Sequence, residues 1–144
     1  MEHTTRLAQF AARLIYADLP SAVIEKAKEI ALHAWGLQIA GSTLPWSQAV
    51  HRQVRAQSGR GQSTVVNYGL RTSMMDAAFA NGTFGHGFEM DDNHAATGVK
   101  GGCVVIPTIQ AMGEQRGSDG RALVLAIAAA YEAMLRVGLA VIPD

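Results

Sequence analysis

The sequence predicts an all-α fold of about six helices, joined by one long glycine-rich loop. Apolar side chains recur at three- and four-residue spacing through most of the chain, as they do along the buried face of a helix. Only the run from Ser63 to Tyr68 has the β-branched composition of a strand, and no partner for it is evident. Hydrophobic residues make up 49% of the chain and charged residues 17%, so its apolar surface needs a packed core.

Two amphipathic helices are expected first. One begins at Thr4 or Thr5 and ends over the run from Asp18 to Pro20, and the next continues from Pro20 to Gly41. The apolar stripe of the first helix is Leu7, Phe10, Ala11, Leu14 and Ile15, and that of the second is Val23, Ala27, Ile30, Ala31, Ala34 and Leu37. Both helices should therefore pack one face against a core.

A third, shorter helix follows Pro45, and the stretch from Ser58 to Gly61 breaks it. We expect Ser63 to Tyr68 to be an extended connector, because no partner strand is evident. Thr72 is a candidate N-cap for a fourth helix that continues through Phe79.

Six glycines in residues 82–102 predict a long irregular segment after the fourth helix. The fifth helix has Pro107 in its first turn and closes at Gly117, and Ser118 or Asp119 caps the sixth. The apolar residues of the sixth helix include Leu123, Ile127, Tyr131, Met134 and Leu135. Because most residues between them are apolar too, we expect a central helix packed by several neighbours.

Charge and composition exclude several classes of function. The 12 Lys and Arg residues balance the 12 Asp and Glu residues, so the chain lacks the basic surplus of a nucleic-acid binder. Glu132 and Arg136 interrupt the last apolar run well short of the roughly 18 to 20 residues of a membrane span, so we predict no membrane association. One cysteine forbids an internal disulfide, and no basic-then-apolar leader precedes Thr5, so we expect a cytoplasmic protein.

Ionisable residues concentrate in the segment from Asn81 to Val105. Nine consecutive residues of it hold His86, Glu89, Asp91, Asp92 and His94. Irregular segments held by rigid helices are common places for catalytic groups. Neighbouring carboxylates also raise one another's pKa, which would let an Asp or Glu exchange a proton near neutral pH.

Other interpretations of this segment stay open. Asp, Asn, Gly and His are also common turn formers. Carboxylates and histidines at short spacing suit a hard or borderline cation, but no HExxH-type pair is present, so we predict no metal. Cys103 precedes the fifth helix, whose dipole could stabilise a thiolate, yet a lone cysteine is more often a small packed residue.

The residues also carry a resemblance to a known family. The segments that carry it read LAQFAARLIYADLPSAVIEKAKEIALHAWGLQIAGS at 7–42, AFANGTFGHGFEMDDNHAATG at 78–98, CVVIP at 103–107 and LAIAAAYEAMLRVG at 125–138. They resemble the MmgE/PrpD family, which includes 2-methylcitrate dehydratases and cis-aconitate decarboxylases. The resemblance covers nearly all 144 residues, and GHGFEMDD is a specific motif.

The resemblance implies a helical domain of a homodimeric lyase that acts on small tricarboxylate-like acids without a metal or an organic cofactor. Such enzymes move a proton at a carbon next to a carboxylate while water or carbon dioxide leaves. Carried over to this sequence, the catalytic candidates are Glu89, Asp91 and Lys100, and the substrate-binding candidates are Asp92, Asn93, His86 and His94.

The sequence departs from the family pattern just before the CVVIP run. The family usually has His-Pro-Gly or His-Pro-Ser there, and its His is a leading candidate for proton transfer, whereas this chain has Lys100, Gly101 and Gly102. A lysine could bind a carboxylate or donate a proton, but its ordinary pKa of about 10.4 must fall through burial before it serves as a base. The missing proline also predicts a looser loop.

Family members are much longer than this chain, so we expect residues 1–144 to be a partial helical domain without the rest of that domain or an α+β lid domain. The leading hypothesis is the N-terminal part of a lyase for small di- or tricarboxylates, with dehydration, decarboxylation and isomerisation all open. The alternative is a catalytically inactive helical module that acts by association with itself or with a longer relative. A divalent-metal hydrolase built on the acidic cluster is a weaker third hypothesis.

Overall fold

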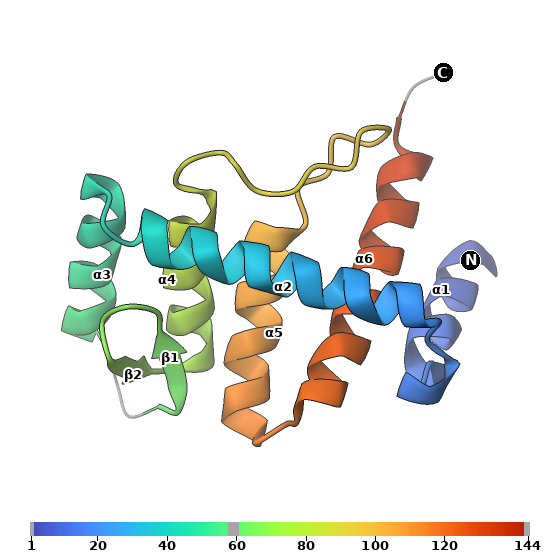
Figure 1. The fold of residues 1–144 in the computed structure, drawn as a ribbon, viewed down its shortest axis with the longest axis horizontal. Helices are drawn as coiled ribbons and strands as arrows, with labels where there is room; N and C mark the ends of the chain where they lie inside the picture. Colours follow the sequence, from blue (N-terminus) through green and yellow to red (C-terminus); the bar gives the residue numbers. More distant parts are fainter. Residues whose placement is uncertain (1, 58–60, 143–144) are drawn as a thin grey trace.

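The computed structural model of this chain describes residues 2–57 and 61–142 (Figure 1). This part of the chain contains six α-helices, which confirms the all-α prediction. They are α1 (Glu2–Arg13), α2 (Ser21–Gly41), α3 (Pro45–Gln57), α4 (Met74–His86), α5 (Gly102–Arg116) and α6 (Gly120–Ala140). A 3-10 helix, η1 (Tyr16–Asp18), and a hairpin of β1 (Ser63–Val65) and β2 (Leu70–Thr72) complete the described elements.

Helices α4 and α5 lie side by side, and α2 crosses both of them (Figure 1). On one side α6 packs against α5 and α2 and is itself contacted by α1, and on the other side α3 contacts α4. The loop from α4 to α5 reaches the C-terminal part of α6, where Thr97 and Val99 lie against Gly138. The segment with the predicted site residues therefore begins and ends on the two central helices and also touches a third.

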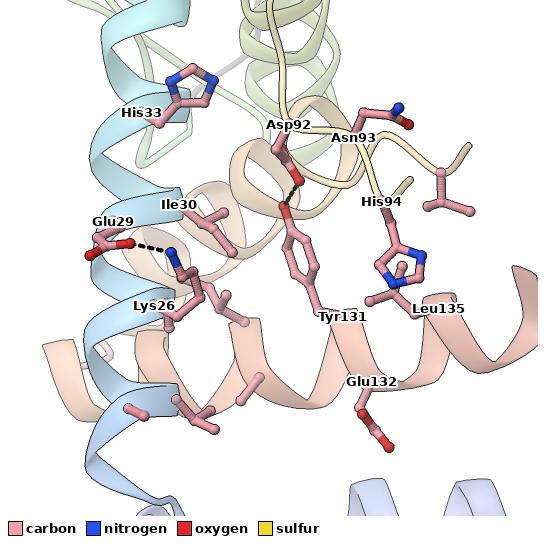
Figure 2. Close-up of a pocket in the computed structure, with 16 residues that line it drawn as sticks. Lys26, Glu29, Ile30, His33, Asp92, Asn93, His94, Tyr131, Glu132 and Leu135 are labelled. Atoms are coloured by element: carbon pink, nitrogen blue, oxygen red, sulfur yellow. Dashed lines mark hydrogen bonds and ion pairs between the residues drawn. The ribbon is translucent and has the colours of Figure 1, made fainter. Parts of the chain in front are cut away.

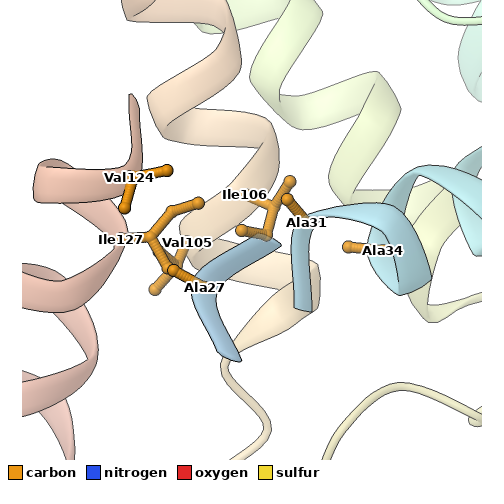
Figure 3. Close-up of a cluster of buried hydrophobic side chains, with 7 residues drawn as sticks. All are labelled: Ala27, Ala31, Ala34, Val105, Ile106, Val124 and Ile127. Atoms are coloured by element: carbon orange, nitrogen blue, oxygen red, sulfur yellow. The ribbon is translucent and has the colours of Figure 1, made fainter. Parts of the chain in front are cut away.

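The main core lies where α2 passes over α5 and α6 (Figure 3). Its buried residues are Ala27, Ala31 and Ala34 of α2, Val105 and Ile106 of α5, and Val124 and Ile127 of α6. The alanines fall on the predicted stripe of α2, and their small side chains let the helices approach closely. At the end of α2 a Cβ on Gly41 would lie 1.9 Å from the carbonyl oxygen of Phe84, so this crossing requires glycine.

A second cluster of buried side chains lies under the hairpin and consists of Val54, Val65, Ala77, Ala80, Phe84 and Ala111. The prediction of an unpaired connector over Ser63 to Tyr68 is wrong, because β1 pairs with β2 in antiparallel register, with Ser63 opposite Thr72. Positive φ angles at Asn67 and Gly69, 67° and 60°, make the turn between them. The partner strand is three residues long, too short to show a periodic pattern.

The first predicted helix is shorter than expected. Helix α1 ends at Arg13, and residues 16–18 form η1 in place of a continuous helix to Asp18. Ile15, which the sequence places on the apolar stripe, is 56% exposed because it lies in the break between the two elements. Residues 58–60, where the sequence predicts the break after the third helix, lie outside the described part of the chain.

Helix α4 is longer than its glycine content predicts. Ser73 caps it, with its Oγ accepting a backbone hydrogen bond at 3.1 Å, whereas the predicted cap Thr72 belongs to β2. The helix continues through Gly82 to His86, and Gly82 serves as a helix contact, since a Cβ there would lie 3.0 Å from the carbonyl oxygen of Cys103. The irregular segment is therefore limited to residues 87–101.

The boundary between α5 and α6 follows the prediction. Gly117, with φ of 66°, ends α5, and the Oδ1 of Asp119 caps α6 by accepting from the backbone of Ala122 at 2.8 Å. The predicted start of α5 is wrong, because the helix begins at Gly102 and Pro107 lies in its second turn.

Helix α6 is not the central helix that its composition predicts. Among its residues Val124, Ile127 and Gly138 are buried, whereas Val137 and Leu139 are more than half exposed. The helix is long and apolar enough to cross a membrane. In this structure 17% of its most apolar 18-residue stretch is buried. The described helices therefore leave much of its apolar surface uncovered.

Candidate functional site

Three predicted site residues meet near the ends of the loop between α4 and α5. The Nδ1–H of His86 donates to Oδ1 of Asp91 at 2.9 Å, and Nζ of Lys100 lies 3.9 Å from the same oxygen. The Asp91 side chain is 2% exposed, whereas those of His86 and Lys100 are 46% and 35% exposed. A buried carboxylate thus holds two basic side chains that solvent can reach.

Asp91 is a carboxylate at neutral pH. Burial raises its pKa, but the adjacent Cys103 thiol, the hydrogen bond from the His86 ring and its own backbone together outweigh burial and hold the pKa below its ordinary value of 3.8. The expectation that neighbouring carboxylates raise one another's pKa is therefore wrong for Asp91, because hydrogen-bond donors surround it.

Cys103, in the first turn of α5, is brought to the same carboxylate. Burial and then the Asp91 carboxylate raise the pKa of its thiol to about 12, so the thiolate that a helix dipole would favour is disfavoured here. The thiol donates to the carbonyl oxygen of Lys100 at 3.7 Å. The ligand atoms of Cys103, His86 and Asp91 lie within 4.8 Å of one another, so this group could hold a metal ion.

Glu89 lies near this cluster without joining it. Its φ of 52° is in the left-handed region, which is uncommon for a residue with a side chain, and its side chain is exposed. Glu89, His86 and Cys103 are the ionisable residues that line a groove of about 770 Å³ between α4 and α5. The groove therefore joins Glu89 to the cluster through solvent-accessible space.

Asp92 uses both carboxylate oxygens within the chain, and Figure 2 shows its bond to Tyr131. Its Oδ1 accepts from the backbone N–H of Gly102 at 2.8 Å, and its Oδ2 accepts from the hydroxyl of Tyr131 at 2.8 Å. Burial and the bond to Asp92 raise the pKa of Tyr131. The sequence places Tyr131 among the apolar residues of the last helix, although a hydroxyl in such a helix is itself a signal of a polar partner.

The loop that carries Lys100 is held in place despite the missing proline. A Cβ on Gly102 would lie 2.2 Å from Oδ1 of Asp92, so the close approach of this carboxylate requires glycine. His94 and Val99 form an antiparallel bridge inside the loop, with the N–H of His94 donating at 3.0 Å. The predicted loosening is therefore offset by bonds within the chain.

Asn93 and His94 line a different cavity, of about 690 Å³, between the loop, α2 and α6 (Figure 2). His94 hydrogen-bonds through Nδ1 with the hydroxyl of Thr97 at 3.0 Å. Lys26 and Glu29 of α2, which form an ion pair with each other, line the same cavity. The structure therefore divides the predicted site residues between two places.

Comparisons with known proteins agree with the resemblance in the sequence. Residues 5–144 match the family described as the MmgE/PrpD N-terminal domain. The chain is 28% identical over 144 residues to the cis-aconitate decarboxylase-like protein oryM of Aspergillus oryzae. The matched region covers 95% of this chain and 30% of that protein. It is 27% identical over 143 residues to a cis-aconitate decarboxylase of Aspergillus terreus, and this match covers 96% of this chain and 29% of that protein. The chain thus spans less than a third of the length of these curated relatives. No solved structure gives a significant match.

Proposed function

The chain belongs to the MmgE/PrpD family, and from this premise we propose that it forms one wall of the active site of a lyase for small di- or tricarboxylic acids. Two relatives named as a cis-aconitate decarboxylase or a protein like it support this substrate class. The observation that carries the proposal is the pair of His86 and the buried Asp91, with Lys100 beside it.

His86 is the proposed proton-transfer group. Its Nδ1–H donates to Asp91, which leaves Nε2 as the ring nitrogen that can accept a proton from a substrate. A buried carboxylate on Nδ1 fixes the tautomer and stabilises the imidazolium that forms. Asp91, predicted as a catalytic residue, is then a positioning residue that acts through His86.

Lys100 is the proposed binding group for a substrate carboxylate. Its side chain is 35% exposed, so its ammonium can pair with an added carboxylate while it stays near Asp91. Glu89, exposed at the groove that His86 also lines, is the proposed second acid or base. These residues approach the substrate from one side only.

We assign the remaining predicted residues to other tasks. Asp92 holds the loop, because Gly102 and Tyr131 already occupy its two oxygens. Asn93 and His94 remain proposed substrate contacts at the cavity between α2 and α6.

The same groups serve dehydration and decarboxylation. In dehydration, Nε2 of His86 takes a proton from a carbon next to a carboxylate, the C–H electron pair forms the double bond, and the hydroxyl leaves with a proton from an acid as water. In decarboxylation, the bond from carbon to a carboxylate breaks, carbon dioxide leaves, and the imidazolium of His86 gives a proton to the carbon.

An absorbance assay for the formation or loss of an unsaturated acid tests the proposal. The 144-residue chain is incubated with cis-aconitate, citrate or 2-methylcitrate, and its activity is compared with that of the His86→Gln and Lys100→Gln variants. We expect a loss of about 10²- to 10⁴-fold for His86→Gln, the usual contribution of a general acid or base. Lys28→Gln is the control, since Lys28 is exposed and pairs with Glu25 on α2. Equal activity of His86→Gln and wild type would contradict the assignment.

A second candidate function is association without catalysis. The exposed apolar surface at the end of α6 favours it, because Val137 and Leu139 of the helix and Val141, the residue after it, are 56%, 53% and 74% exposed. We propose a homo-oligomer in the cytoplasm under either function. Sedimentation velocity of the chain should show a dimer or a larger species, and a compact monomer would count against this candidate.

A further inference from the structure

Acid–base chemistry leaves two groups of the cluster unexplained. The Asp91 side chain is only 2% exposed, and its Oδ2 is buried. None of the described residues gives this oxygen a hydrogen bond. The Cys103 thiol is close to this carboxylate, but it directs its hydrogen bond to the carbonyl oxygen of Lys100. A buried carboxylate oxygen without a donor is uncommon and indicates a missing partner.

We propose that His86, Asp91 and Cys103 form a binding site for a zinc ion. Their ligand atoms already lie within 4.8 Å of one another. Tetrahedral zinc, with bonds of about 2.0 to 2.3 Å, sets its ligand atoms about 3.3 to 3.7 Å apart. The His86 ring already lies against the Asp91 carboxylate, with Nδ1 2.9 Å from Oδ1, so small movements of the side chains suffice to place Nδ1 and Oδ2 around the ion.

The ligand set favours zinc over a hard cation. One imidazole nitrogen, one sulfur and one carboxylate oxygen suit a borderline ion, whereas magnesium and calcium prefer oxygen ligands. Zinc displaces the proton of the Cys103 thiol to solvent, and the His86 ring proton moves from Nδ1 to Nε2 as Nδ1 binds the ion, so the thiolate and the Asp91 carboxylate together balance its charge. Lys100 pairs with Oδ1 of Asp91, which leaves Oδ2 for the ion.

The ion can reach this site from solvent. The His86 side chain is 46% exposed, and His86 and Cys103 both line the groove between α4 and α5. Three protein ligands leave a fourth position for water. The spacing of His86 and Asp91 is compatible with a cation site, but the sequence does not indicate Cys103 as the third ligand, because 11 residues separate it from Asp91 across a loop and the start of a helix.

Zinc binding has a consequence that rests on the proposed function. Zinc occupies the ring of His86 and the carboxylate of Asp91, so it removes the pair that would transfer a proton. Zinc is therefore expected to inhibit the lyase, and chelation is expected to restore it.

Cobalt(II) substitution tests the site without reference to turnover. The chain has one cysteine, so a thiolate-to-cobalt charge-transfer band in the near ultraviolet reports Cys103 alone. Wild type is titrated with cobalt and then with zinc, beside the variants Cys103→Ser, His86→Gln and Asp91→Asn. His51→Gln is the matched control, because His51 stacks on Tyr68 at 3.6 Å and is no member of the cluster. Circular dichroism checks that each variant is folded.

We expect one equivalent of cobalt to produce the band in wild type and in His51→Gln, and zinc to remove it. The band should be absent in Cys103→Ser, and the affinity should fall by about tenfold or more in His86→Gln and Asp91→Asn. No band in folded wild type, or unchanged affinity in both folded ligand variants, would overturn the proposal. A chain that binds cobalt but turns over no acid upholds the zinc site and counts against the lyase. A chain that turns over an acid but gives no cobalt band upholds the lyase and overturns the zinc site.

Discussion

The hydrogen bond from Tyr131 to Asp92 is the contact that ties the site loop to α6, and Tyr131→Phe removes it with little other change. The hydroxyl donates to Oδ2 of Asp92 at 2.8 Å, while the ring packs against the main core. A hydrogen bond to a charged group contributes about 1.5 to 3 kcal/mol, so the free energy of unfolding should fall by about that amount.

Tyr68→Phe is the matched control for this substitution. The Tyr68 hydroxyl also donates at 2.8 Å, but its acceptor is the neutral carbonyl oxygen of Ser42. Loss of a neutral hydrogen bond costs only about 0.5 to 1.5 kcal/mol. The difference between the two variants therefore isolates the charge of Asp92.

Urea unfolding followed by circular dichroism measures both free energies. A small domain loses about 1 to 3 kcal/mol of stability per molar urea, so the midpoint for Tyr131→Phe should fall by roughly 1 M. Hydrogen exchange at the Gly102 amide, which donates to Asp92, should also become faster. A stability loss for Tyr131→Phe no larger than that for Tyr68→Phe would refute the view that Asp92 anchors the loop.

Three further predictions use the same chain in chelator-containing buffer. Gly102→Ala should lower the free energy of unfolding by about 1 to 3 kcal/mol, because the added Cβ would lie 2.2 Å from Oδ1 of Asp92. In Gly36→Ala, the control, the added Cβ would meet no heavy atom within 4 Å, so the free energy of unfolding should rise by about 0.5 to 1 kcal/mol. Urea titrations measure both. Iodoacetamide should alkylate Cys103 at pH 8 at least about tenfold more slowly than a free cysteine, since the pKa of its thiol is raised to about 12. Asp91→Asn should speed the reaction, because the Asp91 carboxylate contributes to that rise. Mass spectrometry that finds equal rates for Cys103 and a free cysteine would contradict this prediction. The folded state lowers the pKa of Asp91, so its stabilising contribution should be complete above the ordinary value of 3.8 and be lost as the pH falls through the folded pKa. Acid titration of wild type should show this loss, and Asp91→Asn should lack that component.

Local signals in the sequence predicted much of the helical fold. Gly117 and Asp119 mark the boundary between α5 and α6 because a left-handed residue and a capping carboxylate act within one turn. Ala27, Ala31 and Ala34 likewise revealed the buried face of α2, because helical periodicity needs no knowledge of the partner.

Features that depend on contacts between distant residues were not predictable in this way. The hairpin partner of β1 is too short for a pattern, and Gly82 looks like a helix breaker until α5 is placed against it. The apolar composition of α6 indicates a buried helix, but it does not say whether this chain supplies what buries it.

The candidate site also combines features that the local sequence predicts with features that depend on contacts between distant residues. The density of ionisable groups in the sequence indicates the segment with His86, Asp91 and Lys100, but it does not show which partner each of the two neighbouring aspartates faces. The fold separates them, since Asp91 faces His86 and Asp92 faces Tyr131. Cys103 joins the cluster only because α5 begins beside the loop.

Exchange of citrate protons with solvent deuterium tests the central claim most directly, because it needs a base and a carboxylate-binding group but no departure of water or carbon dioxide. Proton nuclear magnetic resonance of citrate in deuterium oxide follows the exchange at the carbons next to its carboxylates. If His86 and Asp91 form the proton-transfer pair, the wild-type chain and Lys28→Gln should catalyse this exchange, and His86→Gln should lose it by about 10²-fold or more. Exchange that is absent in wild type, or equally fast in His86→Gln, would contradict the claim.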